Sequence, residues 1–312
     1  MDHLERGSLI IDGLKTVILD EADRMLDMGF RDDIEQILSG APKERQSVFF
    51  SATMPKPIQD LIKRSSNNPE HIKILPPKGE QGKNIEQFVV DCDRSMKADA
   101  LLRIIAFNRY RRGIIFCSTK IMVDELTESL GEHGIPCDRL HGDIRQRDRD
   151  SIMRKFREGQ FEFLVATDVA ARGLDVDDLE VVFNYDVPND AEDYTHRIGR
   201  VGRAGRTGKA YSFFSSKGER FHMERIAGST RFPITRAVIP TKEQVDKQRQ
   251  EAFANDLLAL VASGKFKKKD IVASAILAAA ASPADAISAV IHFYEHGGVN
   301  PDQPVPVVHH QV

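Results

Sequence analysis

The chain has 312 residues, of which 41% are hydrophobic and 29% are charged, and its formal net charge is −3. This composition is typical of a soluble globular protein with about two domains of ordinary size. A net charge so close to zero excludes binding to nucleic acid through an overall positive field, so such a partner must meet a local basic patch.

The cysteines, the N-terminus and the apolar runs indicate a cytoplasmic location. Cys92, Cys117 and Cys137 lack the spacing of a metal site, and we interpret them as reduced, buried thiols. No basic and apolar leader is present at the N-terminus, which predicts that the protein is not secreted. The longest apolar run, Ile271 to Ala281, is too short to cross a bilayer, so no membrane partner is expected.

A short apolar segment near the start of the chain ends in a cluster of carboxylates. Residues 17–19 favour a buried strand, and Asp20, Glu21 and Asp23 follow within four positions. Ligands of parallel α/β sheets bind beyond the carboxyl ends of the strands. An acidic pair in that place can hold Mg²⁺ and orient a water, although a solvated acidic turn remains open from these residues alone.

Strand-like and helix-like segments then alternate along the chain. Further strands are expected at residues 47–50, 88–90, 114–117, 163–166, 181–183 and 211–214, and helices at residues 30–38, 58–64, 98–105 and 123–130. This alternation predicts an α/β fold with a parallel sheet covered by helices on both faces. The polar, turn-forming run 76–84 is interpreted as an interdomain linker.

Polar residues recur at the ends of these expected strands. Asp20, Ser51, Thr119 and Asp168 each come just after the carboxyl end of a strand. Because ligands of parallel sheets bind at that edge, the placement predicts one shared ligand-facing edge rather than scattered loop residues.

A basic run without any acidic residue extends from His196 to Lys209. Arginines three positions apart on a turn or short helix lie close together and can converge on one phosphate. They could stabilise the charge that develops in phosphoryl transfer. The run alone leaves a solvated basic face equally open.

Five segments, in this order, resemble motifs of the DEAD-box ATP-dependent RNA helicase family, in particular its bacterial cold-shock type. They are Asp-Glu-Ala-Asp at 20–23, Ser-Ala-Thr at 51–53, Ile-Ile-Phe-Cys-Ser-Thr-Lys at 114–120, Ala-Thr-Asp-Val-Ala-Ala-Arg-Gly-Leu-Asp at 166–175 and His-Arg-Ile-Gly-Arg-Val-Gly-Arg at 196–203. The similarity covers about residues 1–238. It implies parallel-sheet RecA-like domains, RNA as partner, and ATP with Mg²⁺ as cofactors.

The resemblance also implies roles for individual residues in ATP hydrolysis. Asp20 would hold Mg²⁺ through its water shell, and Glu21 would position or deprotonate the attacking water. Asp175 would contact the ribose of ATP, and Arg200 and Arg203 would reach its terminal phosphate.

Further motif residues are implied to couple the domains or to bind RNA. The coupling residues would be Asp23, Ser51, Thr53 and His196. The residues that would contact the RNA backbone or organise that surface are Thr119, Gly142, Gln146, Arg149, Thr167 and Asp168. Contacts to the backbone would make binding largely independent of base sequence.

Two features depart from the family pattern. Val201 stands where the family usually has Thr. The family's upstream adenine-binding motif and its phosphate loop, which ends in Gly-Lys-Thr, have no counterpart in these 312 residues, since Gly82-Lys83, Gly208-Lys209 and Gly264-Lys265 lack the other loop residues. We therefore expect a helicase without the N-terminal part of its first domain, which is an ATP hydrolase by family but inactive as this chain alone.

The expected domains are the C-terminal part of a first RecA-like domain at 1–75, the linker at 76–84, a second RecA-like domain at 85–238, a helical extension at 239–298 and a disordered tail at 299–312. In the extension, Thr241 and Gln244 predict a capping box, and Asp270 and Ser282 predict two later helix starts. The extension weakly resembles the helical dimerisation segment of bacterial cold-shock DEAD-box helicases, which implies a homodimer.

Three functions are open from the sequence. The leading one is an ATP-dependent RNA helicase that unwinds or remodels RNA duplexes, in ribosome assembly or RNA decay. The alternative is a catalytically incomplete RNA-binding or assembly fragment, because the phosphate loop is absent from these residues. A DNA translocase of the wider superfamily fits less well with the acidic motif paired with Ser-Ala-Thr. ATP turnover separates the first two, and RNA against DNA stimulation separates the first and third.

Overall fold

The computed structural model of the chain describes residues 1–27, 29–51, 53–73, 85–171, 176, 179–202, 206–229, 233–264 and 269–295. The chain divides into two compact units, Met1–Lys78 and Gly79–Val312. The linker expected at 76–84 and the terminal tail expected at 299–312 lie outside the described residues.

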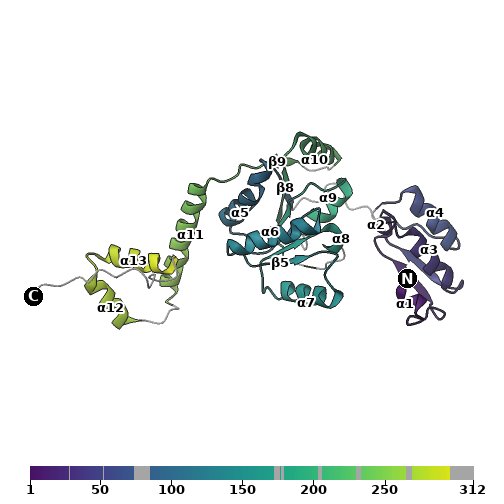
Figure 1. Cartoon of the computed structure of the whole chain (residues 1–312), viewed down its shortest axis with the longest axis horizontal. Helices are drawn as coiled ribbons and strands as arrows, with labels where there is room; N and C mark the ends of the chain where they lie inside the picture. The colour runs from purple at the N-terminus through teal and green to yellow at the C-terminus, as the bar shows by residue number, and fades with distance from the viewer. Residues whose placement is uncertain are drawn as a thin grey trace, which may run out of the picture. The chain divides into compact units, whose positions relative to one another are not determined.

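In its described residues, the first unit contains a two-stranded parallel sheet with helices packed against it (Figure 1). Its elements are α1 (Asp2–Glu5), β1 (Thr16–Leu19), α2 (Ala22–Asp27), α3 (Arg31–Gly40), β2 (Gln46–Phe49) and α4 (Lys56–Ser65). Ile58, Leu61 and Ile62 form the apolar face of α4 and pack against Leu19 and Leu38.

The two-stranded sheet leaves apolar side chains uncovered. Ile18 on β1 is 61% exposed and Phe50, directly after β2, is 56% exposed. Parallel sheets normally have both faces covered, and a two-stranded sheet is marginal by itself. The first unit therefore has a small core.

The second unit is built on a seven-stranded sheet in which every pair of neighbouring strands is parallel, in the order β5-β6-β4-β7-β8-β3-β9. Its strands are β3 (Ile85–Asp91), β4 (Gly113–Phe116), β5 (Cys137–Leu140), β6 (Phe163–Ala166), β7 (Val181–Asn184), β8 (Gly208–Phe214) and β9 (Ile234–Arg236). Its helices up to residue 229 are η1 (Arg94–Met96), α5 (Lys97–Asn108), α6 (Lys120–Glu132), α7 (Gln146–Arg157), α8 (Asp168–Ala171), α9 (Ala191–Ile198) and α10 (Lys217–Ser229).

Helices cover both faces of this sheet, as the alternation of segments predicts. Ile115 of β4 and Val165 of β6 belong to one buried cluster, which includes residues of α5 and α6. Their neighbours Ile114 and Leu164 belong to a second cluster, which includes residues of α7. Because side chains alternate across a strand, the continuous apolar runs of β4 and β6 contribute side chains to both buried clusters. The fold is therefore of the expected α/β type.

The central strands were predictable because they are apolar throughout, whereas the edge strands were not. β5 lies at one edge of the sheet and is fully buried only at Leu140, since Asp138 and Arg139 occupy its middle. The three-residue β9 lies at the other edge and has no buried residue. Neither strand has the apolar run that indicates a buried strand.

Helices α11 (Lys242–Ser263), α12 (Asp270–Ala279) and α13 (Pro283–Glu295) form the expected extension. The capping box of Thr241 and Gln244 is confirmed, and α11 ends at Gly264 with a left-handed φ of 61°. The expectation that Asp270 caps α12 is wrong, because Lys269 is the N-cap and makes no side-chain capping bond. Helix α11 is joined to the end of α5 by an ion pair of 2.7 Å between Arg109 and Asp256.

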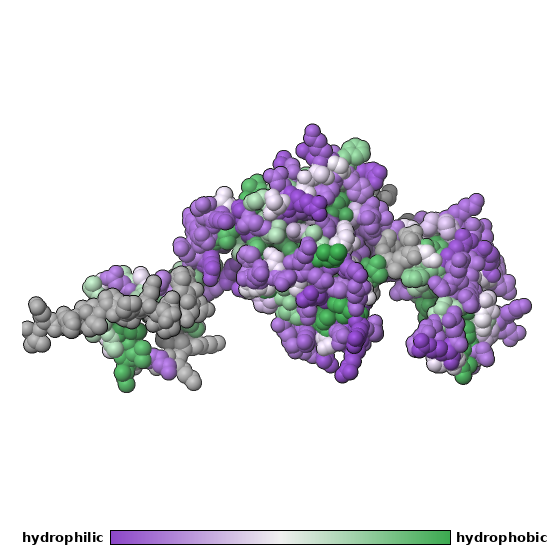
Figure 2. Space-filling view, viewed as in Figure 1, coloured by the Kyte–Doolittle hydropathy of each residue, from purple (hydrophilic) through white to green (hydrophobic). Residues whose placement is uncertain are grey.

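The extension exposes many large apolar side chains. They include Leu257, Leu258, Leu260, Val261, Ile271, Val272, Leu277, Ile287, Val290 and Phe293. In Figure 2, green residues gather on the part of the surface formed by α12, whereas the surface of the central unit is mostly hydrophilic. Among the described helices, none taken singly has the length and apolar character to cross a membrane, but α12 and α13, bent by 113°, pass that test as a pair.

Candidate nucleotide and RNA site

The acidic loop of the first unit lies beside the Ser-Ala-Thr loop. Leu19, the last residue of β1, pairs with Phe49, the last residue of β2. Beyond the strands, the N–H of Phe50 donates to the carbonyl of Leu19 at 2.8 Å, and the N–H of Ala22 donates to the carbonyl of Phe50 at 3.0 Å. The expectation that Asp20 and Ser51 share the carboxyl edge of one sheet is confirmed within this unit.

Asp20 and Glu21 occupy a tight turn at this edge. Glu21 has a φ of 50°, a left-handed conformation that is uncommon for residues other than Gly, and its N–H donates to Oδ1 of Asp20 at 3.0 Å. Asp20 is exposed and Glu21 is half-buried. No three potential metal ligands come together in the described part of the chain. Mg²⁺ often binds through one or two carboxylates while keeping several of its waters, and the exposed carboxylate of Asp20 is compatible with such binding.

Asp23 is 1% exposed and connects the two loops. Its Oδ2 accepts from the N–H of Thr53 at 2.7 Å and from the Thr53 hydroxyl at 2.9 Å. The hydroxyl of Ser51 donates to the carbonyl of Thr53 at 2.6 Å. These contacts place three of the four expected coupling residues in one hydrogen-bonded group.

In the second unit, strand register brings most of the expected RNA-contacting segments to one edge. Phe116 pairs with Ala166 and Asn184, and Ala166 pairs with Leu140, so these strands end at the same level. The segments that follow them carry Thr119, Gly142, Thr167 and Asp168. Thr119 and Asp168 therefore share one edge, whereas Asp20 and Ser51 follow strands of the separate two-stranded sheet, so the edge expected for all four residues is confirmed only within each unit.

The side chains of these residues have different surroundings. Thr119 caps α6 by accepting from the N–H of Met122 at 3.2 Å. Gly142 is exposed, and the amide of Gln146 donates to Asp150 at 2.9 Å. Arg149 donates to the carbonyl of Ala170 in α8.

Arg149 therefore joins α7 to α8 in this structure through a hydrogen bond within the protein itself. Sequence reasoning assigned it to the RNA-contacting set. The contact with Ala170 shows that Arg149 supports the helix that begins at Asp168, and its contact with RNA stays a prediction.

Helix α9 presents the basic motif of this unit. Asp190 caps it by accepting from the N–H of Asp193 at 2.7 Å, and Tyr194 and Ile198 are buried on its inner side. His196 and Arg200 are half-buried. Arg203 and Asp175, both expected to contact ATP, lie outside the described residues.

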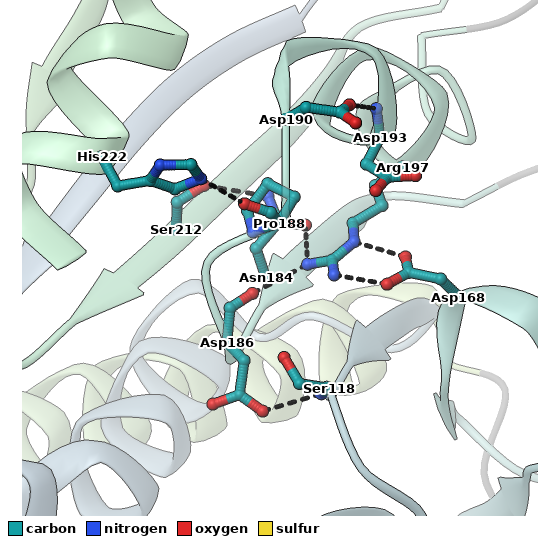
Figure 3. Close-up of polar contacts among 10 residues, drawn as sticks. All are labelled: Ser118, Asp168, Asn184, Asp186, Pro188, Asp190, Asp193, Arg197, Ser212 and His222. Carbon is teal, nitrogen blue, oxygen red and sulfur yellow. Dashed lines mark hydrogen bonds and ion pairs between the residues drawn. The ribbon is translucent and has the colours of Figure 1, made fainter. Parts of the chain in front are cut away.

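Arg197 and Asp168 form a bidentate ion pair between α9 and α8 (Figure 3), in which Arg197 is buried and Asp168 is partly buried. Nε and Nη2 of Arg197 donate to the two carboxylate oxygens of Asp168 at 2.6 and 2.7 Å. The sequence grouped Arg197 with the basic motif but gave it no role of its own. The pairing joins residues 29 positions apart, and only the strand order reveals it.

Asp186 is a second residue that sequence reasoning missed. It lies two positions beyond the end of β7, at the same edge as Thr167, and its Oδ2 accepts from the N–H of Ser118 at 2.8 Å. A search for polar residues after every strand, rather than only after those in recognised motifs, would have found it.

Cys117 does not add a nucleophile to this edge. Its side chain is fully buried, and burial raises the pKa of its thiol, so the thiolate is disfavoured. The described chemistry of the edge consists of hydroxyls, backbone groups and ion pairs.

Comparison with known protein families gives two matches. Residues 1–61 match the DEAD/DEAH box helicase family, and residues 96–205 match the helicase conserved C-terminal domain. The first match covers the loop of Asp20 to Asp23, and the second covers α9 and the edge that carries Thr119 and Asp168.

Curated relatives give the same result. The chain is 44% identical over 263 residues to the DEAD-box ATP-dependent RNA helicase CshA of Geobacillus kaustophilus, covering 84% of this chain and 56% of the relative. It is 39% identical over 256 residues to the ATP-dependent RNA helicase DbpA of Bacillus subtilis, covering 81% of this chain and 53% of the relative. The chain thus spans about half the length of the curated relatives it matches.

Solved structures include a similar protein. S. cerevisiae Dbp5 bound to RNA and ADP BeF3 is 32% identical, with a TM-score of 0.70, and the match covers 80% of this chain and 65% of that chain. Together with the matching families and the motif loops described above, these similarities show that the chain belongs to the DEAD-box family of ATP-dependent RNA helicases.

Proposed function

We propose that this chain supplies the water-positioning, phosphate-contacting and RNA-binding groups of an ATP-dependent RNA helicase. The observation that carries the proposal is the pair of strand edges, one bearing Asp20 and Glu21 and the other bearing Thr119, Gly142 and Thr167. The helicase would unwind or remodel RNA duplexes, with ribosome assembly or RNA decay as its setting.

The acidic edge supports a role in ATP hydrolysis. Asp20 would hold hydrated Mg²⁺, and Glu21, fixed in a tight turn, would orient the attacking water. The bound Mg²⁺–ATP would supply the phosphoryl group for transfer to that water. Arg200 and Arg203 would approach the terminal phosphate, while Asp175 would contact the ribose.

The 312 residues contain no Gly-Lys-Ser or Gly-Lys-Thr phosphate loop. Backbone amides and a Lys of such a loop normally hold the β- and γ-phosphates. We therefore propose that this polypeptide by itself binds RNA but does not turn over ATP, and that a phosphate loop supplied by further chain is needed for catalysis.

RNA binding would use the carboxyl edge of the second unit. Hydroxyls and exposed backbone there suit contacts to phosphate and sugar, which carry little base specificity. The exposed apolar side chains of α11, α12 and α13 would join two copies of the chain, since a surface with many large apolar side chains favours association.

ATP turnover in the presence of RNA tests the proposal. We expect no RNA-stimulated hydrolysis by the purified 312-residue polypeptide, and RNA-stimulated hydrolysis once an in-frame segment with a phosphate loop is fused to it. In that fusion, Glu21→Gln or Arg200→Ala should remove most of the turnover, and DNA should not replace RNA. Clear RNA-dependent hydrolysis by the unfused polypeptide would contradict the proposal.

A further inference from the structure

Arg197 lies at the centre of a buried polar network at the carboxyl edge of the second unit (Figure 3). Besides its two bonds to Asp168, its Nη1 donates to the carbonyl of Asp186 at 2.8 Å and to the side-chain oxygen of Asn184 at 3.3 Å. Its guanidinium also lies over the ring of Phe116, 5.2 Å from the centroid. The side chain is only 2% exposed, so its edges and one face are occupied by the protein itself.

Asp186 extends the network to the loop before α6. Its carboxylate accepts from the N–H of Ser118 and lies 3.3 Å from the ammonium group of Lys97, whose side chain is 4% exposed. Ser118 directly precedes Thr119. The residue whose carbonyl holds Arg197 therefore also fixes the loop that carries Thr119.

The network reaches Arg200 through the backbone. The N–H of Arg200 donates to the carbonyl of Arg197 at 3.2 Å, and the N–H of Val201 donates to the carbonyl of Ile198 at 3.1 Å. Val201 is 2% exposed and packs closely against Gly208. A Cβ added to Gly208 would lie only 2.5 Å from the Cβ of Val201. The short segment that bears Arg200 is thus held at both of its ends.

The chemistry of Asp168 points to Arg197 as its partner. Both of its carboxylate oxygens already accept from the guanidinium, and a carboxylate repels the phosphates of RNA. Buried ion pairs are weak contributors to stability compared with apolar packing, so this pair is better explained by the geometry that it imposes.

We propose that Arg197 is a positioning residue that holds three segments in one rigid arrangement: Ser118–Thr119, Thr167–Asp168 and Arg200. RNA contact at the first two and phosphate contact at the third then depend on the same side chain. Arg197 acts through Asp168 and Asp186 and touches neither ligand. The inference rests on the proposed function for the roles of the three segments, whereas the coupling between them is a property of the protein alone.

Hydrogen exchange of the full 312-residue chain tests the coupling without any ligand. Arg197→Lys keeps the positive charge but removes the bidentate contact with Asp168. The matched control is Tyr110→Phe, which removes another buried hydrogen bond, 3.1 Å to Tyr211, beyond the amino end of β4. In Arg197→Lys, exchange should rise about tenfold or more in peptides covering 117–120, 166–169 and 198–202, but not in 101–106.

The control variant, Tyr110→Phe, should leave the hydrogen-exchange rates of these three segments unchanged. A rise confined to α9 would overturn the proposal, because the segments would then be independent. A uniform rise across the whole unit would also overturn it, because Arg197 would then support only global stability. Asp168→Asn, which keeps the shape of the side chain, should give the same segment pattern and replaces Arg197→Lys if that variant does not fold.

RNA affinity tests the functional part. We expect Arg197→Lys to bind a single-stranded RNA about tenfold more weakly, with the same dependence of affinity on salt as the native chain. A slope shallower by about 0.7 would mean a lost phosphate contact and would overturn the positioning role. Native chain that binds no RNA would instead contradict the proposed function, and the exchange pattern would still decide whether the segments are coupled.

Discussion

Asp23 and Thr53 hold the two loops of the first unit together, because one carboxylate oxygen of Asp23 accepts both the N–H and the hydroxyl of Thr53. Thr53→Val removes the hydroxyl donor and keeps the backbone donor. We expect this change to lower the free energy of unfolding of the first unit by about 1 kcal/mol.

Thr53→Ser keeps the hydroxyl and is the control, with a much smaller expected effect. Hydrogen exchange in peptides covering 16–27 and 46–65 measures the difference under native conditions. Equal exchange in Thr53→Val and Thr53→Ser would show that the hydroxyl bond does not stabilise the loops.

The two units should differ in resistance to proteases. The first unit has a two-stranded parallel sheet with Ile18 and Phe50 exposed, whereas the second has a seven-stranded sheet with both faces covered. Limited proteolysis followed by mass spectrometry should therefore show the first cuts before residue 76 and a persistent fragment covering 85–238. Equal protection of both segments would contradict this expectation.

Stability should fall at alkaline pH because buried thiols keep their protons. Cys117 is fully buried and its pKa is raised from an ordinary value of 9.0, and the pKa of the half-buried Cys137 is raised to about 11. Above pH 9 the unfolded chain releases protons that the folded chain retains. The free energy of unfolding should then decrease with rising pH, by about 1.4 kcal/mol per pH unit for Cys117.

Urea unfolding at pH 8.5, 9.5 and 10.5 measures this dependence. Cys117→Ala should show a shallower decline over the same range, whatever its stability at pH 8.5. An identical decline in the variant and the native chain would assign the effect to other groups.

The extension should control association of the chain. We expect the native chain to sediment as a dimer and a chain without residues 241–312 to sediment as a monomer, because the exposed apolar faces of α11, α12 and α13 would be removed. Leu258, which is 66% exposed, allows a milder test, since Leu258→Lys should weaken the dimer without disturbing the fold. A monomer in every case would contradict this prediction.

The sequence predicts those helices and strands whose own residues indicate where they begin or that they are buried. The apolar runs of β4, β6 and β7 indicate buried parallel strands, and the capping box at Thr241 indicates the start of α11. Helix α7 was harder to predict, because Met153 and Phe156 are its only fully buried residues and most of the others are charged.

The candidate site also has parts that the sequence predicts and parts that it does not. Polar residues after strands identify the edges, since that rule needs only the position of each strand. The roles of Arg197, Asp186 and Arg149 depend on contacts between segments far apart in the sequence, such as Arg149 with Ala170. Those contacts follow from the strand order, which hydrophobic periodicity does not specify.

RNA affinity of two glycine variants tests most directly whether the carboxyl edge of the second unit binds RNA. Gly142 lies at that edge and Gly131 near the end of α6, and both are exposed with open space where a Cβ would be added. Gly142→Asp and Gly131→Asp therefore add the same charge at two different places. Fluorescence anisotropy with a labelled single-stranded RNA should show affinity about tenfold lower for Gly142→Asp and nearly unchanged for Gly131→Asp. Equal affinities of the two variants, or a loss only in Gly131→Asp, would contradict RNA binding at this edge.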